Sequence, residues 1–272
     1  FPTRRSSDLI STVIIMNMKK LDVLVVGSTG YIGIQLVKLL CKHKFIKIKY
    51  LCGYSSIGRQ IHAYSKDLKR YKLPKIVNIN YKYFKEVDVI FTALPNGQSQ
   101  IIANNLEKKN ILIDLSADFR ITKANIYKQF YKINHKSKVL LNQSSYGLSE
   151  LNEKKIKVKK IIACPGCYPT SVIIPLFPLF KNKFLKKNNV IIDSKSGYSG
   201  AGKSILKKAK KMNLFESLSA YGIPNHRHNA EINQELSIIS KNIKFSFTPH
   251  ILPMFRGILS TIYVEKKNNI KT

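Results

Sequence analysis

Residues 21–33, which read LDVLVVGSTGYIG, decide the fold. The first half is a compact, valine-rich apolar run that stops at Gly27, as a buried parallel strand does. The second half leads into residues 34–40, whose apolar spacing is typical of a helix packed on a sheet. The sequence therefore predicts a strand, a glycine-rich turn and a helix in direct succession.

The glycine-rich turn is also a candidate binding site. Its first glycine permits a tight turn, its second lets the backbone approach a pyrophosphate, and its third lets the helix pack against the strand. The helix N-terminus supplies amides and a partial positive charge to the phosphates. A glycine pattern alone is weak, but a strand before it and a helix after it favour a dinucleotide site over an ordinary turn. The candidate cofactor contacts here are Gly27, Ser28, Thr29, Gly30, Tyr31, Ile32 and Gly33.

The end of the second predicted strand, residues 47–52, distinguishes NAD from NADP. An NAD site usually carries an acidic residue there to hold the ribose hydroxyls. The segment that follows this strand, residues 53–59, contains no acidic residue. The hydroxyls of Ser55 and Ser56 and the charge of Arg59 suit a 2′-phosphate instead, which favours NADP(H) over NAD.

Alternating strands and helices continue from there to about residue 165, which predicts an α/β fold with a Rossmann-like, doubly wound parallel sheet over residues 18–165. The further predicted elements are strands at 87–93, 111–115 and 160–164 and a helix at 99–109. Residues 1–17 are interpreted as a non-native or disordered lead-in, because their apolar part is too short for a targeting peptide and no small-residue cleavage site follows.

Residues 166–272 have a different texture and predict an α+β second domain with a mostly antiparallel sheet. The expected elements are an apolar segment at 170–180, strands at 190–194, 243–248 and 257–264, and a helix at 229–239. Residues 265–272 follow the last strand directly and offer no closing element. We therefore expect this domain to be incomplete at its C-terminal end.

Cys167 is the candidate nucleophile. It lies between a predicted strand and a predicted helix, and Pro169 suits a first helical turn. A helix N-terminus stabilises a thiolate, although a buried inert cysteine is the ordinary alternative. The Cys164–Cys167 spacing also fits a redox pair or half a zinc site, but no second cysteine pair exists, so no metal is expected.

His226 and His228 directly precede the predicted helix at 229–239. Proximity to a helix N-terminus lowers the pKa of a histidine and keeps it neutral, as a base requires. A helix cap and a surface histidine explain the pair equally well. The glycine-rich loop at 196–203 can cradle an anion with successive amides and Lys203, or can be a plain surface loop.

Composition restricts the classes of partner. A net charge of +32 suggests nucleic-acid binding as one function. The lysines are spread along the chain, however, which favours a solvated surface over a nucleic-acid patch. No apolar run is long enough to span a membrane. Four cysteines in 272 residues favour a reducing, cytoplasmic setting. An apolar sheet in the second domain favours a homo-oligomer, as a dimer or tetramer.

Several stretches together resemble N-acetyl-γ-glutamyl-phosphate reductase, a family related to aspartate-semialdehyde dehydrogenase. The most specific are DLSADFR at 114–120 and PGCYPT at 165–170. The others, in family order, are 27–33, ALPNG at 93–97, YGLSE at 146–150, 196–203, HRH at 226–228 with Glu231-Ile232, and 249–257. Two positions depart from the family pattern, which usually has Asn in place of Cys164 and an arginine in place of Tyr54.

The resemblance implies an NADPH-dependent reductase of arginine biosynthesis. Cys167 would attack the acyl phosphate of N-acetyl-γ-glutamyl phosphate, and hydride transfer to the thioacyl group would give N-acetylglutamate 5-semialdehyde. His226 or His228 would handle protons, and the resemblance does not say which. It also implies cofactor contacts at Pro95, Ser199 and Gly200. The candidate groups for the substrate's carboxylate and phosphate are Arg120, Lys203, Arg227 and Arg256.

Two alternatives stay open at this point. The first is a sister reductase that acts on another acyl phosphate, such as aspartyl phosphate or an aminoadipyl derivative, and keeps Cys167. The second is a truncated, inactive and strongly basic remnant that binds nucleic acid, which steeply salt-dependent DNA binding without NADPH oxidation would indicate.

Overall fold

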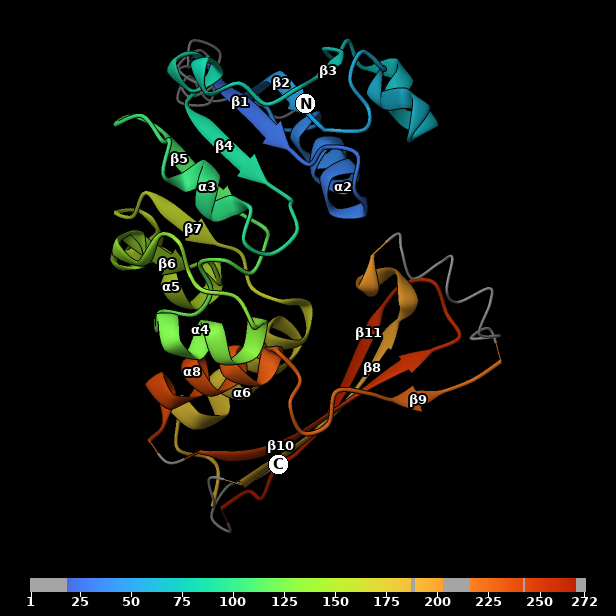
Figure 1. The fold of residues 1–272 in the computed structure, drawn as a ribbon. Coiled ribbons are helices and arrows are strands. Elements are labelled where there is room, and N and C mark those ends of the chain that lie inside the picture. Colours follow the sequence, from blue (N-terminus) through green and yellow to red (C-terminus); the bar gives the residue numbers. More distant parts are fainter. Residues whose placement is uncertain (1–18, 187–188, 203–215, 242, 268–272) are drawn as a thin grey trace, which may run out of the picture. The chain divides into compact units, whose positions relative to one another are not determined.

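The computed structural model describes residues 19–186, 189–202, 216–241 and 243–267 (Figure 1). The described residues divide between two compact units. One runs to Phe91 and includes Glu107–Ile111, and the other comprises Thr92–Leu106 and the chain from Leu112 onward. This division falls inside the predicted nucleotide-binding domain, and the predicted domain boundaries stay predictions. The lead-in at 1–17 and Lys203 lie outside the described residues.

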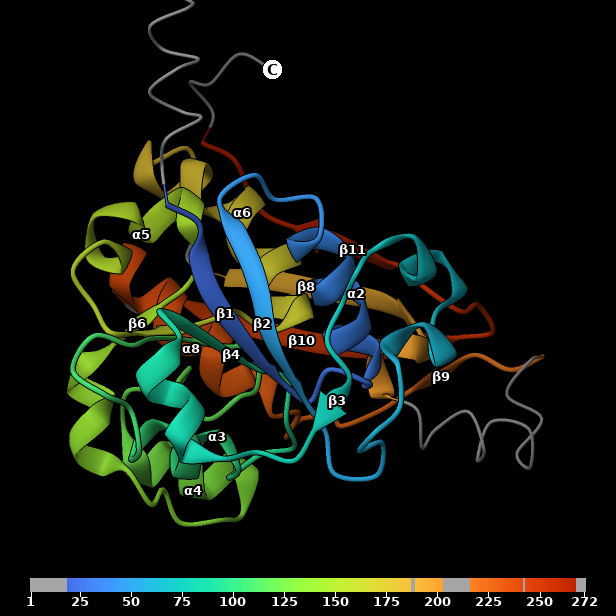
Figure 2. The same cartoon turned by 90° about the horizontal axis from the view of Figure 1, so that it is seen from above.

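The predicted strand, turn and helix at the start of the fold are confirmed. Strand β1 (Leu21–Val26) ends at the glycine turn, helix α2 (Tyr31–Leu40) follows it, and β2 (Ile46–Cys52) pairs with β1 in parallel. Figure 2 shows the two strands side by side. Leu24 and Val25 of β1 and Val37 of α2 are fully buried. The apolar spacing of the sequence thus corresponds to the packed faces of strand and helix.

The strands up to residue 163 form a seven-stranded sheet of order β3-β2-β1-β4-β5-β7-β6. Its neighbours β1 and β2, β2 and β3, β5 and β7, and β6 and β7 run parallel. The strand order reverses between β1 and β4, which is the place where doubly wound sheets bind their ligands. The remaining elements of this part are η1 (Ile61–Ala63), η2 (Lys66–Arg70), β3 (Ile76–Val77), η3 (Tyr81–Glu86), β4 (Val89–Thr92), α3 (Ser99–Ala103), β5 (Ile111–Asp114), α4 (Ala124–Tyr131), η4 (Lys138–Gln143), β6 (Ser144–Tyr146), α5 (Ser149–Ile156) and β7 (Ile161–Ala163).

A second sheet of four strands has the order β11-β8-β10-β9. Its central pair, β8 (Asn189–Gly197) and β10 (Lys244–Leu252), is parallel. Strands β11 (Ile258–Tyr263) and β9 (Ser219–Ala220) are antiparallel to their neighbours, so two of the three pairs are antiparallel and the sheet is mixed. This agrees with the predicted α+β second domain.

Helices α6 (Cys167–Lys181) and α8 (His228–Ile239) lie side by side in Figure 1, and both pack on the second sheet. Their shared core contains Val172 and Leu176 of α6, Ile232 and Leu236 of α8, and Phe247 of β10, all buried. Each of these helices begins at a residue that was a candidate for catalysis. Among the described residues no helix is both long enough and apolar enough to cross a bilayer.

Candidate active site

The glycine turn after β1 has the geometry of a dinucleotide site. Gly27 has a φ of +83°, and the amides of Gly27 and Ser28 both donate to the carbonyl of Cys52, over 3.0 and 3.1 Å. A Cβ added at Gly33 would lie 2.1 Å from the carbonyl oxygen of Gly27, so only glycine lets α2 approach the turn this closely. Gly30, by contrast, has room for a methyl group, whose nearest neighbour would be 3.5 Å away. The N-terminus of α2 lies at this turn, and the N-terminus of a helix is a suitable place for a phosphate.

The segment after β2 presents two of the three predicted 2′-phosphate contacts to solvent. Ser55 and Arg59 are exposed. Ser56 is 3% exposed, and its hydroxyl accepts a hydrogen bond from Tyr64 over 2.7 Å. The side chain of Ser56 therefore supports the loop, whereas the cofactor contacts of Ser55 and Arg59 stay predictions.

The motif at 114–120 holds the loop that contains Pro95. The buried carboxylate of Asp118 accepts the amides of Gly97 and Ser99, over 2.7 and 3.0 Å, and the hydroxyl of Tyr127 over 2.7 Å. Asp114 similarly accepts the hydroxyl of Thr92 over 2.8 Å. The two aspartates of this motif are thus structural anchors for the segment that joins β4 to α3.

Cys167 is the first residue of α6, with Gly166 as the N-cap, and it is exposed. The prediction that the helix N-terminus lowers its pKa is wrong for the net effect. Desolvation by neighbouring groups raises the pKa of the Cys167 thiol, although the amides of Cys167 and Tyr168 and the charge of Arg120 act in the opposite direction. Cys164 is a free thiol as well, and burial raises its pKa to about 11.

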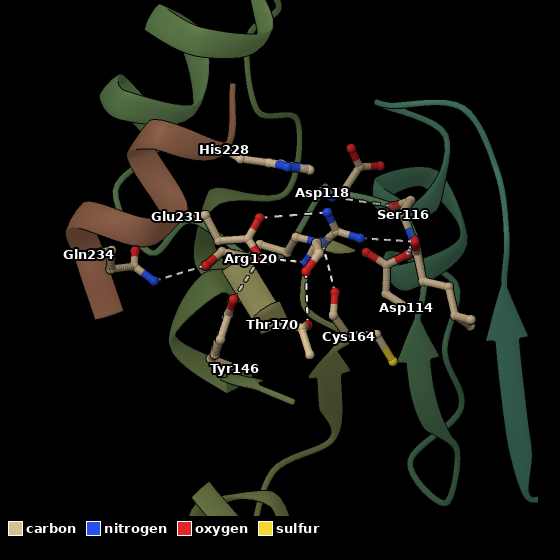
Figure 3. Close-up of polar contacts among 12 residues, drawn as sticks. Asp114, Ser116, Asp118, Arg120, Tyr146, Cys164, Thr170, His228, Glu231 and Gln234 are labelled. Carbon is tan, nitrogen blue, oxygen red and sulfur yellow. Dashed lines mark hydrogen bonds and ion pairs between the residues drawn. The ribbon is translucent and has the colours of Figure 1, made fainter. Parts of the chain in front are cut away.

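Arg120 is 9% exposed, and Figure 3 shows its side chain between Glu231 and Cys164. Its Nε donates to the carbonyl of Cys164 over 2.7 Å and its Nη2 to the carbonyl of Leu115 over 3.2 Å. Its Nη1 lies 3.6 Å from Oε2 of Glu231. A guanidinium with these three partners is a positioning group for the strand ends, which disfavours the predicted direct contact of Arg120 with the substrate.

Gly166, the residue before Cys167, binds both Glu231 and Thr170. Its amide donates to Oε1 of Glu231 over 2.6 Å, and its carbonyl accepts the amide of Thr170 over 3.0 Å and the hydroxyl of Thr170 over 2.9 Å. A Cβ added at Gly166 would lie 2.7 Å from Nε2 of His228, 3.0 Å from Oε2 of Glu231 and 3.1 Å from Nη1 of Arg120. A side chain at this position would displace the ends of these three buried side chains, which favours glycine before the candidate nucleophile.

The structure distinguishes the two histidines. His228 is 5% exposed and directs Nε2 at the Cys167 turn, while Nδ1 of His226 accepts the backbone amide of His228 over 3.1 Å. Burial, and secondarily the charge of Arg227, lowers the pKa of His226 to about 4. Burial also lowers the pKa of His228 well below its ordinary value. The prediction of neutral histidines agrees with these shifts, but their main cause is burial and not the helix end.

Aromatic rings surround the two histidines. The ring of Tyr168 lies 5.7 Å from that of His226 and 5.8 Å from that of His228, between centroids. Phe247 and Tyr221 complete the group at 5.5 and 5.4 Å from His226. Such rings exclude water from the imidazoles, which is the physical reason for the depressed pKa values.

The remaining predicted contacts lie on loops or, for Ser199 and Gly200, in the 3-10 helix η5 (Tyr198–Ala201). Arg227 and Arg256 are exposed. The amides of Gly197, Tyr198 and Ser199 donate to the carbonyls of Gly257, Met254 and Phe255, over 2.9 to 3.0 Å. The predicted anion cradle of successive amides is therefore wrong for these three residues. Cofactor contacts at Ser199 and Gly200 stay predictions.

Sequence reasoning assigned no role to Glu231, Tyr146 or Asp118. Glu231 carried a readable signal, because it is three residues after His228 on a predicted helix and so shares its face. The carboxylate of Asp118, the Tyr146 hydroxyl and the backbone of Gly166 meet partners far away in the chain, which no local pattern indicates.

Fold and site together define an oxidoreductase with a nicotinamide dinucleotide site and a cysteine at a helix N-terminus. Residues 22–159 match the family model "Semialdehyde dehydrogenase, NAD binding domain", and residues 167–272 match "Semialdehyde dehydrogenase, dimerisation domain". The chain is similar in structure to aspartate semialdehyde dehydrogenase II from Vibrio cholerae, with a TM-score of 0.66 and 16% identity over 93% of this chain and 76% of that one. This likeness shows the fold alone.

Relatives of higher identity specify the family. The chain is 44% identical to N-acetyl-gamma-glutamyl-phosphate reductase from Desulforamulus reducens, over 91% of this chain and 72% of that protein. It is 41% identical to the protein of the same name from Ehrlichia canis, over 90% of this chain and 72% of the relative. The chain belongs to the N-acetyl-γ-glutamyl-phosphate reductase family. The resemblance drawn from the sequence and the expected NAD(P) cofactor are thereby confirmed.

Proposed function

We propose that this protein catalyses the NADPH-dependent reduction of N-acetyl-γ-glutamyl phosphate to N-acetylglutamate 5-semialdehyde and phosphate. Besides membership of the family, one structural observation supports this proposal. Cys167 is exposed at the start of α6, and Nε2 of a neutral, buried His228 faces the residue before it. A thiol beside a neutral imidazole is the arrangement that covalent acyl transfer requires.

The first half of the reaction uses Cys167 and His228. As the thiol attacks the acyl carbon, its proton passes to the imidazole, a carbon–sulfur bond forms, and the carbon–oxygen bond to phosphate breaks. The leaving phosphate takes the electron pair. Because the pKa of the thiol is raised and that of His228 is lowered, a resting thiolate–imidazolium pair is disfavoured, and we expect proton transfer to accompany the attack.

The second half reduces the thioacyl group. NADPH, when bound, supplies the hydride. Collapse of the resulting hemithioacetal oxyanion breaks the carbon–sulfur bond and returns the thiolate of Cys167, which then recovers a proton from His228. The observations that fit the cofactor are the left-handed Gly27, the close approach at Gly33 and the exposed Ser55 and Arg59. The last two favour NADP(H), because hydroxyl and guanidinium groups suit a 2′-phosphate.

Charge on the substrate needs basic partners. Arg227 and Arg256 are exposed and are our candidates for the substrate's carboxylate and phosphate, together with Lys203. Arg120 is assigned a positioning role, because its guanidinium already binds two carbonyls and faces Glu231.

We also propose self-association through the outer face of the second sheet. Ile191 of β8, Leu259 of β11 and Tyr263 of β11 are 58%, 66% and 57% exposed, and Tyr263 is in register with Ile191. The matched dimerisation-domain model supports this. Sedimentation equilibrium of the wild type and an Ile191→Lys variant measures the oligomeric state, and a wild type that is monomeric at micromolar concentration contradicts this proposal.

All four cysteines are free thiols, which favours a reducing compartment such as the cytoplasm.

Reverse turnover tests the function. The protein is mixed with NADP⁺, phosphate and N-acetylglutamate 5-semialdehyde, and NADPH formation is followed by absorbance, beside a matched reaction with aspartate 4-semialdehyde. We expect turnover with the acetylated substrate alone and its loss in Cys167→Ser. Turnover with aspartate semialdehyde alone would instead assign the protein to the sister reductases.

A further inference from the structure

Glu231 is the one carboxylate in direct contact with the backbone that presents Cys167, among the residues that the structure describes. Its side chain is fully buried on α8, one helical turn after His228. Its Oε1 accepts the amide of Gly166 and the hydroxyl of Tyr146, each over 2.6 Å (Figure 3). Two short bonds to one oxygen fix both the amide before the nucleophile and the strand β6 that carries Tyr146.

The other oxygen of Glu231 faces a positive charge. Oε2 lies 3.6 Å from Nη1 of Arg120, and the two side chains are 0% and 10% exposed. A buried guanidinium near a thiol stabilises the thiolate, and a buried carboxylate in the same place opposes it. Both act on Cys167: the charge of Arg120 lowers the pKa of the thiol and the charge of Glu231 raises it.

The other groups that face Cys167 are neutral near pH 7. They are His228 on α8, Tyr168 on α6 and Tyr221 after β9. The pKa of His228 is lowered and those of the two tyrosines are raised, in each case chiefly by burial. Arg120 and Glu231 are therefore the pair whose charges set the electrostatic environment of the thiol.

We propose that Glu231 is a positioning residue for the reaction: it holds the Gly166 amide so that Cys167 starts α6 in place, and it balances the charge of Arg120 at the thiol. This deepens the proposed function and rests on it for the identity of Cys167 as nucleophile. The consequence is that the charge of Glu231 adds to desolvation in keeping the Cys167 thiol protonated, and a protonated thiol is less readily oxidised than a thiolate.

Replacement of Glu231 by glutamine separates the two roles. The amide oxygen of glutamine can still accept the bonds from Gly166 and Tyr146, whereas the negative charge is gone and Arg120 is unopposed. The readout is the rate of iodoacetamide alkylation of Cys167 from pH 6 to 10, followed by peptide mass spectrometry, which needs no substrate. We expect the alkylation midpoint to fall by about half a unit to one unit, so that alkylation below the midpoint becomes about three to ten times faster.

Glu235→Gln is the matched control. Glu235 is also buried on α8, one turn further on, and its Oε1 accepts Nε2 of Gln234 over 2.8 Å. Its charge is not among the leading causes of the pKa shift of Cys167, so its removal is expected to leave the midpoint in place. An unchanged or raised midpoint in Glu231→Gln, or an equal fall in Glu235→Gln, would overturn the proposal.

Glu231→Asp keeps the charge and shortens the side chain by one methylene. Here we expect the alkylation midpoint to stay within a few tenths of a unit of the wild type, while reverse turnover drops because the Gly166 amide loses its partner. A midpoint that falls as far as expected for glutamine would contradict the charge balance, and this variant serves the same purpose if Glu231→Gln does not fold. If the wild type itself shows no turnover, the proposed function has failed, and the alkylation results still decide the role of Glu231.

Discussion

Gly33→Ala sets two physical effects of opposite sign against each other. Alanine is favoured over glycine inside a helix by about 0.8–1.0 kcal/mol, so propensity alone makes the variant more stable. The new Cβ, however, would lie 2.1 Å from the Gly27 carbonyl oxygen and 2.9 Å from two backbone atoms of Ser28. Backbone cannot rotate away as a side chain can, so α2 must retreat from the turn by more than about 1 Å to restore ordinary contact.

We expect steric crowding to dominate. Overpacking costs typically about 1–3 kcal/mol, and these contacts are with backbone, so the upper half of that range applies before the propensity gain is subtracted. A net loss of about 1–2 kcal/mol lowers the thermal midpoint of unfolding by about 2–8 °C. NADPH binding, measured by quenching of intrinsic tyrosine fluorescence or by calorimetry, should weaken as well because the turn is distorted.

Gly30→Ala is the control for this prediction. Its Cβ would meet the Gly27 carbonyl oxygen at 3.5 Å, which is ordinary contact, and the φ of Gly30 is −68°. Stability should stay within about 0.5 kcal/mol of the wild type. Affinity for NADPH should nevertheless fall about tenfold, because the second glycine of the turn lets backbone approach the pyrophosphate. A Gly33→Ala variant that unfolds at the wild-type temperature would refute the reasoning.

Three further predictions concern the catalytic unit. His228→Gln should lower kcat by about 10²- to 10⁴-fold and His226→Gln by much less, because Nε2 of His228 is the nitrogen that faces the Cys167 turn; equal losses in steady-state assays would contradict this assignment. Asp118→Asn should lower the free energy of unfolding, measured with denaturant, by about 1–3 kcal/mol, because two amides and the Tyr127 hydroxyl lose part of their acceptor. Tyr127→Phe should lower it less. An Asp118→Asn variant as stable as the wild type would argue against the anchoring role of this carboxylate. The folded-state pKa of His226 is about 4, below its ordinary value of 6.5, so the unfolded chain binds more protons than the folded one between these pH values. The free energy of unfolding therefore falls as the pH drops through this range. The wild type should lose stability relative to His226→Gln from pH 6.5 to 4, and parallel curves of stability against pH would disprove the shift.

The elements with a strong local pattern were predictable from sequence. The strand at 21–26 coincides with β1, and the glycine turn placed α2 correctly, because an apolar run and three glycines leave few alternatives. The apolar segment predicted at 170–180 lies within α6, which begins at Cys167, and the prediction of a helix start at this cysteine is confirmed. It also contains Pro175 and Pro178, which a local reading takes as breaks.

Short elements escaped prediction. Strands β3 and β6 have only two and three residues, and they exist because a neighbouring strand supplies their hydrogen bonds. The helix predicted at 99–109 ends at Ala103 as α3. Tertiary pairing, and not local propensity, decides such segments.

The candidate site was predictable in its residue types and not in its contacts. Cys167 and the histidine pair were identified from their places before helices. The pKa of Cys167 was expected in the wrong direction, because the sequence shows the helix end but not the groups that desolvate the thiol. Arg120 was expected at the substrate, and only the fold shows that Cys164 and Glu231 already engage it.

The most direct test of the central claim is intact-mass analysis of the enzyme after brief mixing with freshly prepared N-acetyl-γ-glutamyl phosphate and no NADPH. We expect a covalent adduct with the mass of one N-acetylglutamyl group, located on Cys167 by peptide mapping, absent in Cys167→Ser and lost on addition of NADPH with release of the semialdehyde. A folded protein that binds NADPH but forms no adduct, or forms it at another residue, would contradict the claim that this protein is a reductase acting through Cys167.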